Sequence, residues 1–134
     1  MKTVLLLISS LSMCIFAFAH QASFAQDISA YKGEKRPLIV FTSRDTHRKY
    51  SKQIKILEGA RPALEERDVA VLVDTEKTPA STLRLEFLPG EFMVVLVGKD
   101  GEVKLKSTEP VSIDELVETI DRMPMRQQEM QKDG

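Results

Sequence analysis

Apolar residues in this chain gather in short blocks, and three blocks have the length of a strand: residues 38–41, 69–73 and 92–97. An uninterrupted apolar run of this length is typical of a strand that is covered on both faces of its sheet. Residues 102–106 instead alternate between polar and apolar, which predicts an edge strand with one solvated face. The stretch Gly98-Lys99-Asp100-Gly101 is a strong hairpin signal between the last two strands.

Helical spacing lies between the first two strands. A helix that starts near Asp45 is predicted because Tyr50, Ile54 and Leu57 recur at intervals of four and three residues and form one apolar face. A second, shorter piece follows over residues 63–67, since the proline before it is tolerated in the first turn of a helix.

Two further helices are predicted in the second half of the chain. One is short and lies within residues 77–88. The other begins at Ser112, because Ser112 and Glu115 fit a capping box and Val111 can pack against Leu116. The buried face of this helix is formed by Ile113, Leu116, Val117, Ile120 and Met123.

The segments outside these elements are polar. Residues 26–35 are expected to form a loosely held lead-in. Pro124 ends the last helix, and the polar residues 125–134 are expected to form a frayed tail.

The order of the elements restricts the fold. A right-handed crossover makes the first two strands parallel, and the hairpin adds an antiparallel pair. The predicted fold class is α/β, with a mixed four-stranded sheet (βαβ then ββα) flanked by helices. This is the thioredoxin-like arrangement.

Three stretches of the chain resemble domain-of-unknown-function family 4174, a set of small exported bacterial proteins: RPLIVFTSRD, PGEFMVVLVGKDGEVKLKSTEPVS and IDRMPMRQQEM. The resemblance covers residues 36–130 and is most specific in the carboxyl-terminal half. It implies a fold similar to that of peroxiredoxins and thioredoxins. It brings no agreed activity and no catalytic residues that can be carried over to this sequence.

The amino terminus has the pattern of a secretory signal peptide, with a positive start followed by an apolar run over residues 4–18 that is short for a membrane span. Cleavage is expected after Ala25, with Ala19 as the alternative, which leaves a domain of residues 26–134. An uncleaved amino-terminal anchor is the other interpretation. The signal predicts an exported protein, periplasmic or secreted, that is not stably inserted in a membrane after cleavage.

Cys14 is the one cysteine of the sequence and lies within the predicted signal. A mature chain without a thiol excludes disulfide bonds, thiol–disulfide exchange, thiolate peroxidase chemistry and cysteine-ligated zinc. Both halves of a thioredoxin redox site are missing, because residues 46–49 (THRK) lie near the usual thiols and Met93 lies near the expected cis-proline.

The charges of the chain nearly balance, with 19 Lys and Arg against 20 Asp and Glu, and they give no reason to expect a nucleic-acid partner. Their distribution is uneven, however. Arg44, Arg48, Lys52 and Lys55 are spaced by four, four and three residues, which predicts one exposed basic face on the first helix.

The turn between the first strand and this helix is the candidate site for a small anion. A helix start presents unpaired N–H groups and a partial positive charge, which Arg44 and His47 would reinforce. The simpler interpretation is that Ser43 or Asp45 caps the helix and that the basic face is only solvated. No metal site or cofactor is predicted, because His20 is expected to leave with the signal and a lone histidine forms no familiar metal site.

Two classes of function remain. The leading one is a non-catalytic binding or accessory module for a small anion or an acidic exported protein. The alternative is a thiol-independent enzyme that acts on a small anionic substrate at the same turn. A cavity in which Arg44, His47 and a buried carboxylate converge would favour the enzyme, and an exposed, flat turn would favour the module. The candidate residues for either are Ser43, Arg44, His47, Arg48, Lys52 and Lys55.

Overall fold

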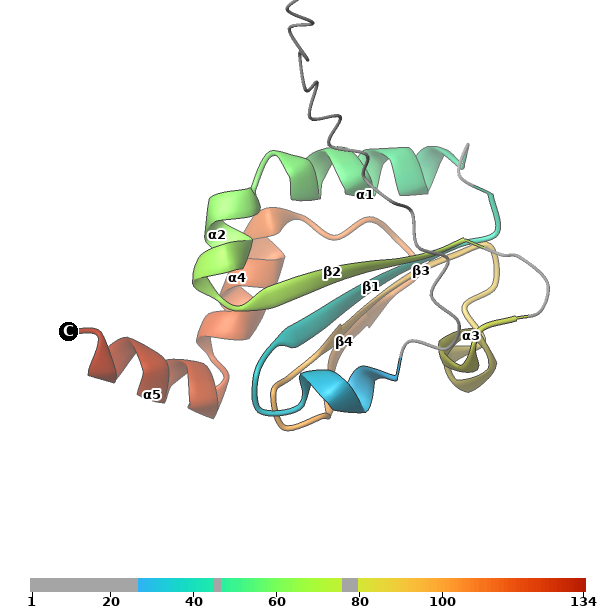
Figure 1. Ribbon diagram of the computed structural model, residues 1–134. Helices are drawn as coiled ribbons and strands as arrows, with labels where there is room; N and C mark the ends of the chain where they lie inside the picture. The colour runs from blue at the N-terminus through green and yellow to red at the C-terminus, as the bar shows by residue number, and fades with distance from the viewer. Residues whose placement is uncertain (1–26, 45–46, 76–79) are drawn as a thin grey trace, which may run out of the picture.

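A four-stranded mixed sheet forms the centre of the computed structural model, which describes residues 27–44, 47–75 and 80–134 (Figure 1). The sheet order is β2-β1-β3-β4. Strands β1 and β2 are parallel, whereas β3 is antiparallel to both β1 and β4. The predicted mixed α/β arrangement is therefore confirmed. The strands are β1 (Arg36–Thr42), β2 (Val69–Thr75), β3 (Phe92–Val97) and β4 (Val103–Ser107).

Helices cover both faces of this sheet (Figure 1). The helices α1, α2 and α4 contribute to a hydrophobic cluster on one face, and α3 and the short 3₁₀ helix η1 pack in a second cluster on the other. A fifth α-helix follows α4. The helices are η1 (Ile28–Tyr31), α1 (Arg48–Glu58), α2 (Arg61–Glu66), α3 (Thr82–Phe87), α4 (Ile113–Asp121) and α5 (Pro124–Lys132).

The two central strands supply both clusters. Every residue of β1 and β3 is buried, as the uninterrupted apolar runs predicted. Alternate side chains enter opposite clusters: Val40 belongs to the α1 side and Phe41 to the α3 side. The prediction of a buried β2 is wrong, because β2 is an edge strand on which Val71 and Val73 are 40% and 46% exposed.

Both polar ends of the domain are more ordered than predicted. In the lead-in, Ile28 and Tyr31 of η1 pack against the cluster on the α3 side, and the Gly33 N–H donates to the Lys99 carbonyl at 2.8 Å. At the other end, the predicted frayed tail is the helix α5, and Arg126 within it is buried. Pro124 ends α4 as predicted, and it also opens α5.

A buried ion cluster explains why α5 is ordered. Arg36 has no exposed surface, and its guanidinium donates to the Glu129 carboxylate of α5 at 3.0 and 3.2 Å and to the Arg67 carbonyl at 2.8 Å. Lys99, in the β3–β4 turn, binds Glu129 at 2.7 Å and Asp68 at 2.8 Å. An unpaired charge in this position would destabilise the fold, so the cluster holds α5 against the sheet.

A second set of ion pairs joins α5 to the other helices. Arg67 binds both oxygens of Asp121 at 2.9 Å, and Arg126 reaches Asp121 at 3.3 Å and Glu66 at 3.0 Å. Although these side chains are polar, they bind residues at the ends of α2 and α4 and hold α5 in place. Polar composition alone therefore misled the prediction of a frayed tail.

The start of α4 provides a first test of these assignments. The Glu115 N–H donates to the Ser112 hydroxyl at 3.2 Å, which confirms the predicted cap, and Leu116 is fully buried. Ser112→Ala should lower the free energy of unfolding by about 1 kcal/mol, and Leu116→Ala should lower it by about 2 to 5 kcal/mol. Ser51→Ala, on the exposed face of α1, is the matched control. Equal urea midpoints for all three variants would contradict the assignment.

The ion pairs predict a loss of stability in acid. Hydrogen bonds from Arg67 lower the pKa of Asp121. Burial acts to raise the pKa of Glu129, but hydrogen bonds from Arg36 and Lys99 outweigh it, so that the pKa of Glu129 is lowered too. A carboxyl with a lowered folded pKa stabilises the fold above its unfolded pKa, and this contribution is lost as the pH falls through the folded value. We therefore expect the free energy of unfolding to decrease below about pH 4.

The matched variants for this test are Glu129→Gln and Glu118→Gln. Within the described residues Glu118 pairs with Arg122 on the surface of α4, away from the buried cluster, so it is the surface control. Neutralisation of Glu129 should make the dependence shallower and lower the stability at neutral pH. Chemical unfolding followed by circular dichroism at a series of pH values measures both effects. Identical pH profiles for the two variants would refute a role for the buried cluster.

Candidate functional site

The candidate turn begins where β1 ends, and hydrogen bonds of Thr42 and Ser43 hold it in place. The buried Thr42 hydroxyl donates to the Arg44 carbonyl at 2.6 Å and accepts from the Arg44 N–H at 3.2 Å. The Ser43 N–H donates to the Glu91 carbonyl at 2.9 Å, which ties the turn to the residue before β3. Arg44 is exposed, and neither Arg44 nor Ser43 lines the cavity between α1, α2 and β2.

The helix after this turn begins later than predicted. The first residue of α1 is Arg48, and its N-cap residue is His47, whose side chain makes no capping hydrogen bond. Ser43 lies before the helix and does not cap it, so this prediction is wrong. Asp45, the other predicted cap, lies outside the described residues, as does Thr46. The backbone N–H of His47 donates to the Arg44 carbonyl at 3.1 Å.

His47 packs against the sheet instead of facing a pocket. Its ring stacks on Phe92 of β3, with 6.1 Å between ring centroids and an interplanar angle of 8°. Its Nε2 atom lies 4.0 Å from the Glu91 carboxylate, which is 83% exposed. Its Nδ1 atom is buried, and no hydrogen-bond partner for it lies among the described residues. These contacts hold the imidazole in place. Among the described residues they bring no second group beside it with which it could act in catalysis.

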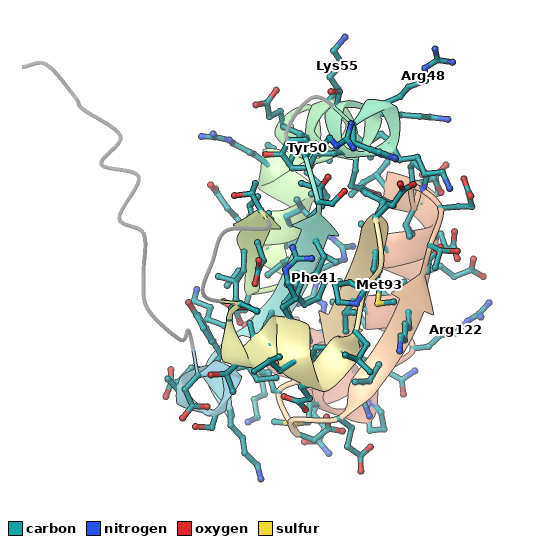
Figure 2. The ribbon with its side chains drawn as sticks, turned by 90° about the vertical axis from the view of Figure 1, so that its right-hand side faces the viewer. Phe41, Arg48, Tyr50, Lys55, Met93 and Arg122 are labelled. Atoms are coloured by element: carbon teal, nitrogen blue, oxygen red, sulfur yellow. The ribbon has the colours of Figure 1, made fainter. Side chains whose placement is uncertain are left out.

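Met93, which the sequence places near the expected cis-proline, faces away from His47, whereas its neighbour Phe92 faces it. Met93 pairs with Phe41 in the sheet, and both side chains lie in the cluster on the α3 side, as Figure 2 shows. Neighbouring residues of a strand point to opposite faces, so Phe92 and Met93 belong to different clusters. The position facing the α1 side at the start of β3 thus holds an aromatic ring.

A basic surface covers the solvent side of α1. We define the basic α1 face as Arg48, Lys52 and Lys55, all of which are exposed. Figure 2 shows Arg48 and Lys55 pointing away from the sheet, whereas Tyr50 points toward it. Arg44 was predicted to share this face, but it precedes the helix and is not on it.

The side chains of the basic α1 face have no carboxylate partner within 4.0 Å in the described part of the chain. The first turn of α1 contains no acidic residue either. Lys49, on the flank of the helix, differs because it pairs with Glu109 and donates to the Thr108 carbonyl at 3.1 Å. The surface therefore carries uncompensated positive charge.

A buried arginine that was not predicted from the sequence lies near the same end of the sheet. Arg84 of α3 donates to the Thr42 carbonyl at 3.0 Å, to the Asp74 carbonyl at 2.9 Å and to the Asp74 carboxylate at 3.1 Å. Its guanidinium also lies 5.7 Å from the centre of the Phe41 ring. Ser81 caps α3 and binds the same carboxylate. In the sequence, Arg84 follows Ser81 by three residues, and this pattern does not distinguish a buried arginine from an exposed one.

This arginine has a structural role. Its donors are directed at the ends of β1 and β2, so Arg84 fastens α3 to both strands. The carboxylate of Asp74 is half-buried, but it is held by Arg84 and Ser81. It is thus not available as a free acid or base for the candidate turn.

The described cavity lies away from the candidate turn. It has a volume of about 310 Å³ and lies between α1, α2 and β2, where Ile54, Leu57, Leu64, Val69 and Val71 line it. Within residues 27–44, 47–75 and 80–134, no group of three His, Cys, Asp or Glu side chains is arranged to hold a metal ion. Nor does any described helix have the length and apolar character needed to cross a membrane.

Solved structures similar to this one include peroxiredoxins. The reduced 2-Cys peroxiredoxin of Plasmodium vivax has a TM-score of 0.59 and 20% identity, over 75% of this chain and 84% of the other. Thioredoxin peroxidase I of Plasmodium yoelii has a TM-score of 0.58 and 20% identity, over 75% and 79%. At this identity the similarity establishes the fold, and the predicted thioredoxin-like fold is confirmed.

Sequence comparison gives the family. No curated protein sequence matches this chain. A family profile described as "Domain of unknown function (DUF4174)" matches residues 27–129, which is most of the sequence and includes every strand and the candidate turn. The predicted family resemblance is confirmed, and the chain belongs to the DUF4174 family of thioredoxin-like domains.

Proposed function

We propose that this protein is an exported, non-catalytic binding module that holds an acidic partner on the basic α1 face. One observation carries the proposal: Arg48, Lys52 and Lys55 lie together without a described carboxylate partner. Many other cations of the domain are neutralised, as Lys99 and Lys104 illustrate. Unpaired charge of one sign on a rigid helix attracts a ligand of the opposite sign.

The spacing of the three cations suits an extended ligand better than a single small anion. Arg48 and Lys55 are seven positions apart in α1, which corresponds to about 10 Å along the helix axis. An acidic peptide segment with several carboxylates can reach all three side chains at once. A lone phosphate or carboxylate would contact only one end of this row.

The geometry of the turn supports a binding role over catalysis. An enzyme at this site would need Arg44, His47 and a carboxylate to face one enclosed space. Arg44 is exposed, and the carboxylate nearest to His47 among the described ion pairs belongs to the exposed Glu91. The turn also lacks the thiolate on which peroxidase chemistry depends, since the one cysteine of the sequence is Cys14.

Charge reversal tests the proposed surface. Arg48→Glu combined with Lys52→Glu should weaken the binding of a fluorescent polyglutamate peptide by about tenfold or more at low ionic strength. Each lost exposed ion pair contributes about 0.2–1 kcal/mol to binding, and the new glutamates also repel the peptide. Raising the salt concentration should weaken wild-type binding as well, since exposed charges are screened over about 8 Å at physiological ionic strength. Fluorescence anisotropy measures both effects.

The matched control is Lys106→Glu combined with Lys132→Glu, which changes the net charge equally but alters β4 and the end of α5. This control should bind the peptide nearly as well as the wild type. Equal weakening by both double variants would mean that only net charge matters. Binding that is indifferent to the α1 reversal and to salt would refute the proposed surface.

The absence of a thiol at the turn predicts the absence of peroxidase activity. Purified protein should neither consume hydrogen peroxide nor reduce insulin disulfides in the presence of dithiothreitol above the rate of the reagent alone. A 2-Cys peroxiredoxin serves as the positive control for peroxide. Turnover that persists after Cys14→Ser, in metal-free protein, would show that the site has a thiol-independent redox activity and would overturn the proposal.

A further inference from the structure

A fourth cation of α1 adjoins the basic α1 face. Lys49 and Lys52 are separated by three positions, and side chains with this separation are neighbours on the surface of a helix. Arg48 and Lys55 lie four positions before and three positions after Lys52, so the four cations form one continuous row. Lys49 is at the flank of this row that meets the loop between β4 and α4.

Lys49 differs from its three neighbours because a segment of the same chain already binds it. Its ammonium donates to the Thr108 carbonyl at 3.1 Å and pairs with the Glu109 carboxylate. The basic α1 face has no such carboxylate among the residues that the structure describes. A main-chain carbonyl beside a carboxylate is also what an acidic peptide presents to a cation. The segment 108–109 thus binds Lys49 in the way that an acidic peptide would.

The contact between Lys49 and Glu109 is open to exchange. The side chain of Glu109 is 69% exposed and that of Lys49 is 38% exposed, and ion pairs in water contribute little to stability. The backbone of Glu109 is held separately, because the Ser107 hydroxyl donates to its carbonyl at 2.8 Å and accepts from its N–H at 3.0 Å. The carboxylate can therefore leave Lys49 while the loop keeps its conformation.

We propose that Lys49 is a fourth binding residue for the acidic partner and that Glu109 is an internal competitor, which the partner displaces. The inference rests on the proposed function of the basic α1 face and adds how its ligand is selected. On binding, a carboxylate of the partner replaces that of Glu109 at the Lys49 ammonium. The Glu109 side chain then turns to water, which already surrounds most of it.

The competitor favours ligands that carry several carboxylates. Glu109 belongs to the same chain as Lys49, so its effective concentration at the ammonium is high, and a single small acid in solution competes poorly with it. A peptide that Arg48 and Lys52 already hold brings its next carboxylate to Lys49 at a comparable effective concentration. The exchange then replaces one exposed ion pair by another at little cost. Glu109 thus closes Lys49 to lone acids and leaves it open to an acidic segment.

A double-mutant cycle tests the competition. At physiological ionic strength, where charges more than about 8 Å apart are largely screened, Glu109→Gln should tighten the binding of the fluorescent polyglutamate peptide by about two- to fivefold. Lys49→Gln should weaken binding by a similar factor. In the Lys49→Gln background, Glu109→Gln should change the affinity little, because the substitution then releases no cation. Fluorescence anisotropy measures the four affinities.

The matched control for the cycle is Glu115→Gln. Glu115 is exposed in the first turn of α4 and has no ion-pair partner in the described part of the chain, so its neutralisation removes a nearby charge without releasing a cation. This variant should bind the peptide as the wild type does. Circular dichroism establishes that each variant is folded.

Nuclear magnetic resonance follows the displacement directly. In protein labelled with carbon-13, the carboxyl resonance of Glu109 should move when unlabelled polyglutamate is added. The carboxyl resonance of Glu102, which pairs with Lys104 near the start of β4, should stay in place. Free glutamate at the same carboxylate concentration should leave the Glu109 resonance unchanged, because a single acid does not displace the competitor.

The outcomes separate this inference from the proposed function. An equal gain from Glu109→Gln with and without Lys49 would reflect local charge alone and would overturn the inference. A Glu109 resonance that does not move in saturating peptide, or that free glutamate moves as far, would overturn it too. If Arg48→Glu combined with Lys52→Glu still weakens binding in these cases, the proposed function stands. A peptide that does not bind at all refutes both, and a gain that requires Lys49, together with a displaced Glu109 resonance, supports both.

Discussion

The buried guanidinium of Arg36 is the constraint around which this domain is organised. An arginine cannot be deprotonated in a protein, so its burial at the start of the central strand requires a counter-charge. Glu129 supplies it from α5, and the carbonyl of Arg67 accepts a further hydrogen bond, while the buried Nε of Arg36 has no partner among the described residues. Lys99 shares the same carboxylate from the β3–β4 turn. One buried charge thus fixes the relative positions of β1, α5, the hairpin and the turn before β2.

Much of the fold could be predicted because it depends on apolar periodicity. The runs in β1 and β3 and the alternation in β4 predicted their positions correctly. The same logic failed for β2, since an apolar run reports a tendency to be buried and does not say whether a neighbouring strand exists in the same chain. It failed also for α5, where Arg126 and Glu129 are polar but are held by charges from distant segments.

The candidate site was predictable to the extent that it depends on helical spacing. Arg48, Lys52 and Lys55 share a face because positions four and three apart are neighbours on a helix. Arg44 does not, because α1 begins only after His47. The stacking of His47 on Phe92 and the anchoring of α3 by Arg84 are contacts between separate elements, and no local pattern encodes them.

The contact between Arg36 and Glu129 joins residues 93 positions apart in the chain, which has a consequence for the order of events during synthesis. The ribosome makes β1 long before it makes the carboxylate that neutralises the first residue of that strand. Until then, closure of the core would bury a charge without its partner, so the early strands gain little by collapsing. The buried charge of β1 therefore finds its partner only after α5 has been translated, which favours late closure of the core. Such a delay suits a protein whose proposed export requires it to pass through a membrane before it folds.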